Sequence, residues 1–185
     1  MTTAGTASSP ESRLLSRKKL LVGSFKVLLA FALVYPPIAY FESRYIIGVD
    51  PVASGMSSTP YRFYLIDTND RDLRRGDYFA FNSRGMGPFY GDGIKIVKQL
   101  VGVDGDHISV ASRVSVNGEA MGELPHVQPR EKLWYLGKRP ADYIRDLTLS
   151  NGQYWAMGSH PRSFDSRYWG PVLEDQVIGR AYAIF

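Results

Sequence analysis

The run IKIVKQLVGV at residues 94–103 decides the class of fold that the sequence predicts. It is short, rich in β-branched residues and followed at once by the turn sequence DGD at 104–106. Such a run is typical of a strand, and the side chains of a strand alternate between its two faces. The more apolar face consists of Ile94, Ile96, Lys98 and Leu100. Lys98 is therefore the only polar side chain on that face.

Similar short runs occupy much of the chain from residue 61 onward, and dense turn signals separate them. Asn117-Gly118, for example, is typical of a tight hairpin. The further predicted strands are YRFYLI (61–66), DYFAF (77–81), HISV (107–110), RVSV (113–116) and QYWAM (153–157). Only residues 131–148 have a weakly helical pattern. The sequence therefore predicts a mainly β, antiparallel domain of sandwich or barrel type with few helices.

A different pattern lies near the N-terminus, where the 22 residues from Leu20 to Phe41 contain one charge, Lys26. As a helix this segment would be about 33 Å long, at ~1.5 Å per residue, which is enough to cross the core of a bilayer. The cationic stretch RKK at 17–19 precedes it. Because Lys and Arg are enriched in cytoplasmic flanks, we expect the N-terminus in the cytoplasm and the body on the other side.

This segment divides the chain into three parts. We expect a disordered cytoplasmic tail at 1–18, a transmembrane signal-anchor helix at 19–42 and an extracytoplasmic domain at 43–185. A cleaved signal peptide is an alternative, disfavoured by the length of the apolar run and by the lack of a small-x-small cleavage site. A buried helix of a globular core is a second alternative, disfavoured because Pro36-Pro37 would break it.

Charge and composition exclude several classes of function. The net charge of +4 comes from the first 45 residues, since the remainder carries 16 basic and 16 acidic side chains. The body therefore offers no basic field for phosphates, and we expect no nucleic-acid partner. The absence of cysteine excludes disulfides, a thiol nucleophile and thiolate metal sites, but leaves the compartment open. Three isolated histidines show no ligand spacing, so we expect no metal and no cofactor.

Lys98 has two interpretations. A lysine on an apolar strand face either extends its amine to solvent or holds it in a dry environment. In the dry environment desolvation lowers the pKa, and the neutral amine becomes available as a base near neutral pH. The neighbouring motifs favour the second interpretation.

Four segments occur in the order of the boxes that mark type I signal peptidases, and the chain resembles that family. They are SSTP at 57–60, RGDYFAF at 75–81, KQLVGVDGD at 98–106 and SFDSRYWGPV at 163–172. Each is weak alone, and an RGD by itself means nothing. All four in order, downstream of an apolar N-terminal segment, are a strong signal.

The resemblance implies a largely β, membrane-associated serine endopeptidase that works through a Ser/Lys dyad. On the matching positions it makes Ser58 the nucleophile and Lys98 the general base, because a serine hydroxyl needs a base to take its proton. The register of the serine stays open between Ser58 and Ser57. Ser58 fits the spacing of the conjugative relatives, and Ser57 fits that of the housekeeping enzymes.

The same resemblance implies roles for further side chains. Ser163 would orient the amine of Lys98, and Ser57 would help backbone N–H groups to hold the oxyanion. Asp165 and Arg167 would form a structural ion pair behind the site. A Ser58–His160–Asp165 triad is the rival catalytic hypothesis, although His160 lies in no recognisable hydrolase motif.

Departures from the housekeeping pattern point toward a subfamily. Gln99 stands where those enzymes have Arg, and Asp104 stands where they have Pro. These features, with the spacing around Ser58, are more similar to the conjugative-transfer peptidases of the TraF type. That resemblance implies maturation of a pilin subunit, with hydrolysis or cyclisation as the outcome.

The expected partners are membrane lipid and an exported precursor, a prepilin or a protein bearing a signal peptide, with small residues before the cut. The precursor would bind in extended form against a strand edge. The catalytic domain is expected on the periplasmic side of the inner membrane. Two alternatives stay open: a general type I signal peptidase, and a non-catalytic membrane-anchored component of a conjugation or secretion apparatus.

Overall fold

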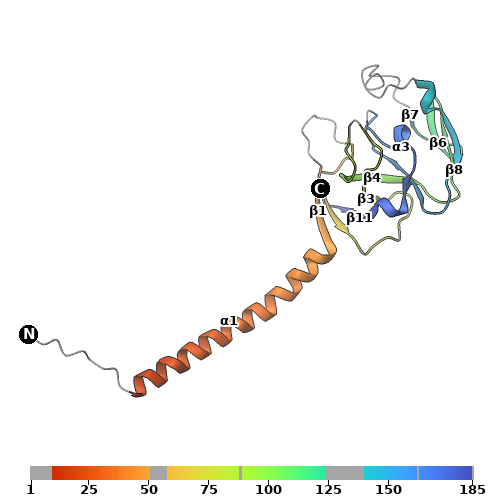
Figure 1. The fold of residues 1–185 in the computed structure, drawn as a ribbon. Helices are drawn as coiled ribbons and strands as arrows, with labels where there is room; N and C mark the ends of the chain where they lie inside the picture. The colour runs from red at the N-terminus through yellow and green to blue at the C-terminus, as the bar shows by residue number, and fades with distance from the viewer. Residues whose placement is uncertain (1–9, 51–57, 88, 124–139, 162, 185) are drawn as a thin grey trace, which may run out of the picture. The chain divides into compact units, whose positions relative to one another are not determined.

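The computed structural model describes residues 10–50, 58–87, 89–123, 140–161 and 163–184 (Figure 1). The chain divides into two compact units, Met1–Ser43 and Arg44–Phe185. The described part of the first unit belongs to one helix, and every strand among the described residues lies in the second unit.

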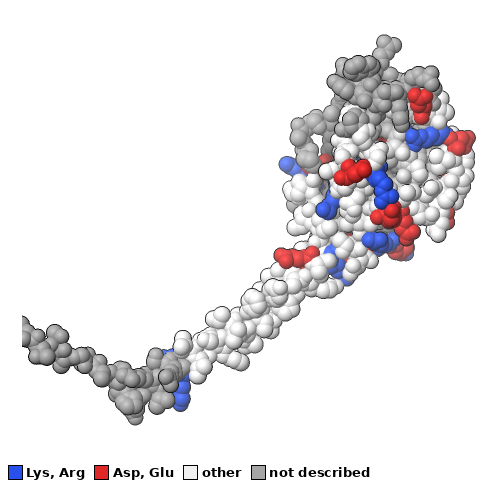
Figure 2. Space-filling model, in the orientation of Figure 1, with Lys and Arg blue, Asp and Glu red and all other residues white. Residues whose placement is uncertain are grey.

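Helix α1 spans Pro10–Arg44 and begins inside the stretch that we expected to be a tail. Proline suits the first turn of a helix because its missing N–H has no partner there in any case. The helix also continues through Pro36 and Pro37, which remove backbone donors but are tolerated in membrane helices. Its stretch Lys18–Arg44 is long and apolar enough to cross a membrane, and none of it is buried within the protein. Figure 2 shows this apolar surface as a long white stretch of the helix.

The second unit is built from two antiparallel sheets, which confirms the predicted class of fold. The larger sheet has the order β1-β2-β11-β3-β4-β9-β10 and the smaller one the order β7-β6-β5-β8. The strands of the larger sheet are β1 (Tyr45–Val49), β2 (Phe63–Asp67), β3 (Tyr78–Asn82), β4 (Lys95–Gly102), β9 (Gln153–Met157), β10 (Val172–Leu173) and β11 (Val177–Ala183). Those of the smaller sheet are β5 (His107–Val110), β6 (Arg113–Val116), β7 (Glu119–Glu123) and β8 (Arg145–Thr148). Short helical elements are η1 (Pro140–Tyr143), α3 (Ser166–Trp169) and η2 (Glu174–Gln176).

The helical pattern expected at 131–148 is wrong at its C-terminal end. Residues 131–139 lie outside the described residues, and Pro140–Tyr143 forms one 3₁₀ turn. Arg145–Thr148 is strand β8, which pairs with β5 from His107↔Thr148 to Val110↔Arg145. Pairing with a neighbouring strand, which a local pattern does not contain, overrides the weak helical signal here.

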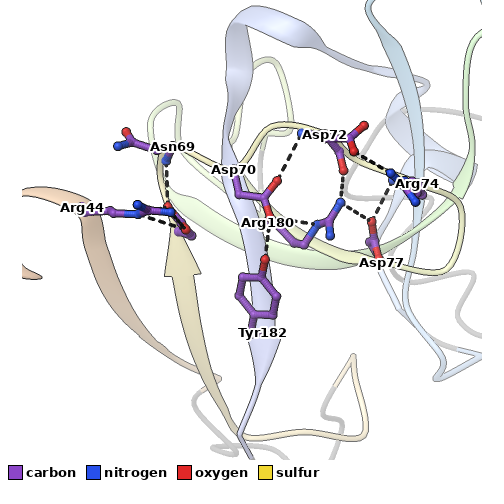
Figure 3. Close-up of polar contacts among 9 residues, drawn as sticks. Arg44, Asn69, Asp70, Asp72, Arg74, Asp77, Arg180 and Tyr182 are labelled. Carbon is purple, nitrogen blue, oxygen red and sulfur yellow. Dashed lines mark hydrogen bonds and ion pairs between the residues drawn. The ribbon is translucent and has the colours of Figure 1, made fainter.

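Strand β11 is an interior strand of the larger sheet, although it is the last strand among the described residues. It pairs with β2 on one side and with β3 on the other. Gly179 makes this possible, because a Cβ at that position would lie 2.0 Å from the carbonyl oxygen of Asp67. The neighbouring residue Arg180 fixes the loop between β2 and β3. Its Nη2 lies 3.1 Å from Asp77 Oδ2 and donates a further hydrogen bond to the Asp72 carbonyl (Figure 3). The C-terminal strand thus orders the loop that leads into β3.

Candidate active site

Lys98 lies in the centre of the larger sheet, on strand β4 between β3 and β9. The burial of this strand alternates residue by residue, and the side chains of Ile96, Lys98 and Leu100 are all buried. The side chain of Lys98 is only 1% exposed. The alternation predicted from the sequence is therefore confirmed for these three residues, and the amine of Lys98 is removed from solvent.

The amine of Lys98 meets a neutral partner. Nζ donates a hydrogen bond to Ser163 Oγ at 3.0 Å. Burial lowers the pKa of Lys98 to about 8, against smaller raising effects of the Asp165 and Asp50 charges. Desolvation destabilises the ammonium because water no longer solvates it, and a hydroxyl replaces only part of that solvation. With a pKa of about 8, about a tenth of this lysine is a neutral amine, able to accept a proton, at pH 7.

A buried ion pair fixes the loop that carries Ser163. Arg167 donates from Nε to Asp165 Oδ1 at 2.7 Å and from Nη2 to Asp165 Oδ2 at 2.6 Å. Asp165 is fully buried and Arg167 is 2% exposed. The guanidinium also donates to the carbonyls of His160 and Ser163. The guanidinium of Arg167 therefore holds together the loop segments that contain His160, Ser163 and Asp165. It thereby fixes Ser163, whose side chain contacts Lys98.

Ser58 contacts the same region of the domain, although it lies about a hundred residues earlier in the chain. Its carbonyl oxygen accepts a hydrogen bond from Ser159 N at 2.9 Å. A Cβ on the adjacent Gly158 would lie 2.5 Å from that carbonyl oxygen and 2.2 Å from Ser163 Oγ. Gly158 is thus the point where the backbone of Ser58 and the side chain of Ser163 come together. Ser57 lies outside the described residues.

No role was assigned to Gly158 from the sequence. It adopts no left-handed backbone conformation that would mark a turn. Its role comes from close approach, since any side chain there would displace either Ser163 or Ser58. Such a constraint arises only when distant segments meet.

The rival triad of Ser58, His160 and Asp165 fits this arrangement poorly. Both carboxylate oxygens of Asp165 accept hydrogen bonds from Arg167, and one also accepts from Gly158 N at 2.9 Å. His160 contributes its backbone carbonyl to the same guanidinium. A carboxylate engaged in this way is already neutralised by Arg167, so it is a weak orienting group for an imidazole.

No group of three or more metal-ligating side chains is arranged to hold an ion in the part of the chain that the structure describes. What the arrangement offers instead is a desolvated amine bonded to Ser163, with the backbone of Ser58 close to that same serine. Such a pair of groups is suited to acyl transfer, in which the amine takes the proton of an attacking hydroxyl.

The chain is similar to known proteins of one family. The model of a family described as "Signal peptidase, peptidase S26" matches residues 21–185. A probable signal peptidase I-2 of Synechocystis sp. is 28% identical over 117 residues, which are 62% of this chain and 49% of that protein. A signal peptidase I of Leptolyngbya laminosa is 29% identical over 117 residues, 60% of this chain and 52% of that protein. The chain therefore spans about half the length of these curated relatives.

A solved structure is also similar to part of the chain. It is the crystal structure of a signal peptidase I from Enterococcus faecalis V583, with 24% sequence identity and a TM-score of 0.38. The match covers 60% of this chain and 98% of that one.

Proposed function

The chain belongs to the signal peptidase family, peptidase S26, and we propose that it is a membrane-anchored serine endopeptidase that cleaves exported precursor proteins. Ser58 is the proposed nucleophile and Lys98 the proposed general base. The single observation that carries this proposal is the buried amine of Lys98, at 3.0 Å from Ser163 Oγ and with its pKa lowered to about 8. A lysine that served only to stabilise the sheet would gain nothing from such burial.

The proposed reaction proceeds through an acyl-enzyme. The neutral amine of Lys98 takes the proton of the Ser58 hydroxyl as the oxygen attacks the peptide carbonyl, and the ammonium then gives that proton to the leaving amine. Backbone N–H groups at Ser58, with help from Ser57, would hold the developing oxyanion. Water resolves the ester, with Lys98 again as the base. Ser163 keeps the amine oriented through both steps.

The proposed substrate is a precursor with a signal peptide and small residues before the cut. We infer that it binds in extended form along a strand edge near Ser58, as added strands do in other peptide-binding proteins. The apolar part of α1 would anchor the enzyme in the membrane, with the cationic N-terminal flank in the cytoplasm. The catalytic domain would then act on the extracytoplasmic side.

A narrower specificity for a conjugative pilin precursor is a second candidate. Gln99 and Asp104 favour it, because both positions depart from the housekeeping pattern. The curated relatives are signal peptidases I, and they favour general precursor processing instead. An assay of breadth separates the two: cleavage of many unrelated secretory precursors fits a general enzyme, and cleavage of prepilin alone fits the dedicated one.

Substitution of the dyad tests the proposal directly. Ser58→Ala and Lys98→Ala are each expected to reduce cleavage of a secretory precursor to background, while both variants still fold and insert. Mass spectrometry of the precursor, with and without the full-length protein, reports the position of the cut and any cyclisation. Wild-type processing by either variant would exclude the dyad, and an inactive wild-type protein would support the non-catalytic alternative.

A further inference from the structure

The residue after the proposed nucleophile is held by a buried hydrogen bond. Tyr64 Oη donates to Thr59 Oγ1 at 2.7 Å, an ordinary length for two hydroxyl groups. Thr59 Oγ1 in turn donates to the carbonyl oxygen of Tyr61 at 3.2 Å. Thr59 is 2% exposed and Tyr64 1%. Two hydroxyls are thus buried immediately beside Ser58 and satisfy each other.

The donor in this contact is rigid. Tyr64 lies on β2, which is paired with β1 on one side and with β11 on the other. Its ring belongs to a buried cluster with Ile66, Ala80 and Ala181. Burial raises the pKa of Tyr64 to about 12, against the lowering effect of its bond to Thr59. The hydroxyl therefore keeps its proton, and remains a donor, at any pH where the protein works.

The segment that contains Ser58 has little regular structure to hold it. Ser58, Thr59 and Pro60 form a bend outside any strand, and β2 begins at Phe63. The carbonyl of Ser58 is held by Ser159 N, and the next side chain along the chain is held by Tyr64. Both contacts act on the C-terminal side of the Ser58 Cα, and only the second depends on a side chain.

We propose that Tyr64 is a positioning residue for the Ser58 nucleophile, acting through the hydroxyl of Thr59. The inference rests on the proposed function, in which Ser58 attacks the substrate. Tyr64 would touch neither the substrate nor the reacting atoms. It would set the place from which the Ser58 hydroxyl approaches the carbonyl and the amine of Lys98.

Misplacement of a nucleophile by about 1 Å costs up to about a hundredfold in rate, because the reacting atoms lose their near-attack geometry. Loss of the Tyr64 hydroxyl should therefore lower kcat and leave KM nearly unchanged. It should also leave the pH dependence unchanged, because Lys98 and Ser163 are untouched. A residue needed only for folding would instead lower the fraction of active protein and the melting temperature.

The test uses the full-length protein in lipid vesicles and a secretory precursor whose signal peptide ends in Ala-x-Ala. Tyr64→Phe is expected to lower kcat about 10- to 100-fold, with KM within about twofold of wild type. Thr59→Val should cause a similar loss, and Thr59→Ser, which keeps the hydroxyl, should restore most of the rate. The double variant Tyr64→Phe/Thr59→Val should be no slower than Thr59→Val alone, because Thr59→Val already removes the hydrogen bond with Tyr64.

Tyr78→Phe is the matched control. It removes a hydroxyl from the ring that lies 5.7 Å from the ring of Tyr64, and it leaves Thr59 Oγ1 with its partner. We expect wild-type kcat for this variant. Melting temperatures measured for every variant separate lost rate from lost fold.

The outcomes distinguish this inference from its premise. Wild-type kcat in Tyr64→Phe, with Ser58→Ala inactive, would overturn the positioning role and leave the proposed function standing. A shift in KM or in the pH profile, in place of kcat, would also overturn it. Full activity of Ser58→Ala would remove the premise itself. If Tyr64→Phe does not fold, equal rates for Thr59→Val and Thr59→Ser would refute the inference, and a selective loss in Thr59→Val would support it.

Discussion

Lys98 and Arg167 are two buried basic side chains of the candidate site, and their partners differ. Lys98 meets a neutral hydroxyl, whereas Arg167 meets a carboxylate. Both side chains are at most 2% exposed. Burial lowers the pKa of Lys98 to about 8, and its hydrogen-bond partner Ser163 is neutral. Burial also acts to lower the pKa of Arg167, but the hydrogen bonds and charge of Asp165 outweigh it and raise that pKa. Similar burial thus leaves one cation with a lowered pKa, able to lose its proton, and the other permanently charged.

The difference shows how one small region can hold a base and a structural charge together. A carboxylate compensates the lost hydration of a cation, whereas a hydroxyl compensates it only in part. Asp165 is committed to Arg167 by two hydrogen bonds, so it does not pair directly with Lys98. The ion pair therefore protects the low pKa of the lysine while it orders the loop of Ser163.

The same substitution at both cations should have opposite effects on stability, and the largest effect on activity is expected at Lys98. Lys98→Met should lower kcat/KM for precursor cleavage about 10²- to 10⁴-fold, the usual contribution of a general base. It should also raise the melting temperature at pH 7, because a neutral side chain avoids the cost of burying an ammonium. A lower melting temperature in Lys98→Met would contradict the comparison.

Arg167→Met should be destabilising, since it leaves the carboxylate of Asp165 buried without its counter-charge. Breaking a buried ion pair in this way typically costs about 3–5 kcal/mol in the free energy of unfolding. Urea unfolding monitored by tryptophan fluorescence measures it. Arg84→Met is the matched control, because the Arg84–Asp175 pair is exposed, and no change in stability is expected there. An equal loss of stability in Arg167→Met and Arg84→Met would mean that burial does not determine how much an ion pair stabilises the fold.

The pH dependence of activity provides the mildest test. Because the neutral amine is the base and its pKa is lowered to about 8, kcat/KM should rise about tenfold per pH unit below pH 8 and level off above it. Burial also means that the folded state binds fewer protons than the unfolded state between pH 8 and the ordinary lysine pKa. Stability contributed by this group should therefore rise with pH across that window. A rate that is flat from pH 6 to pH 9 would indicate another base.

Much of the fold could be predicted, and the exceptions have physical causes. The strand at 94–103 was predictable because its period-two pattern reflects one buried face. Strand β11 was missed because Gly179 and Arg180 interrupt its apolar pattern and its register shifts between Val177 and Gly179. Strand β1 was missed because it follows the last residue of α1 directly, with no turn between them.

Residues of the candidate site could be predicted where they belong to a local sequence pattern. Lys98 was singled out by strand alternation together with the motif that it begins, and Ser163, Asp165 and Arg167 were singled out because they share one contiguous motif. Their roles in catalysis stay predictions. The contact of Gly158 with Ser58 joins residues about a hundred positions apart, and no local pattern encodes such a contact. The Tyr64 hydroxyl was missed for a related reason, since only the folded loop turns Thr59 back toward β2.

The place of β11 also bears on the order in which the larger sheet can form. The strands that flank it, β2 and β3, lie far before it in the sequence, yet β11 is the strand that pairs with both of them. Contacts of such long sequence separation form slowly, because the entropy of closing the intervening loop opposes them. We therefore expect closure of the larger sheet around β11 to be a late step of folding.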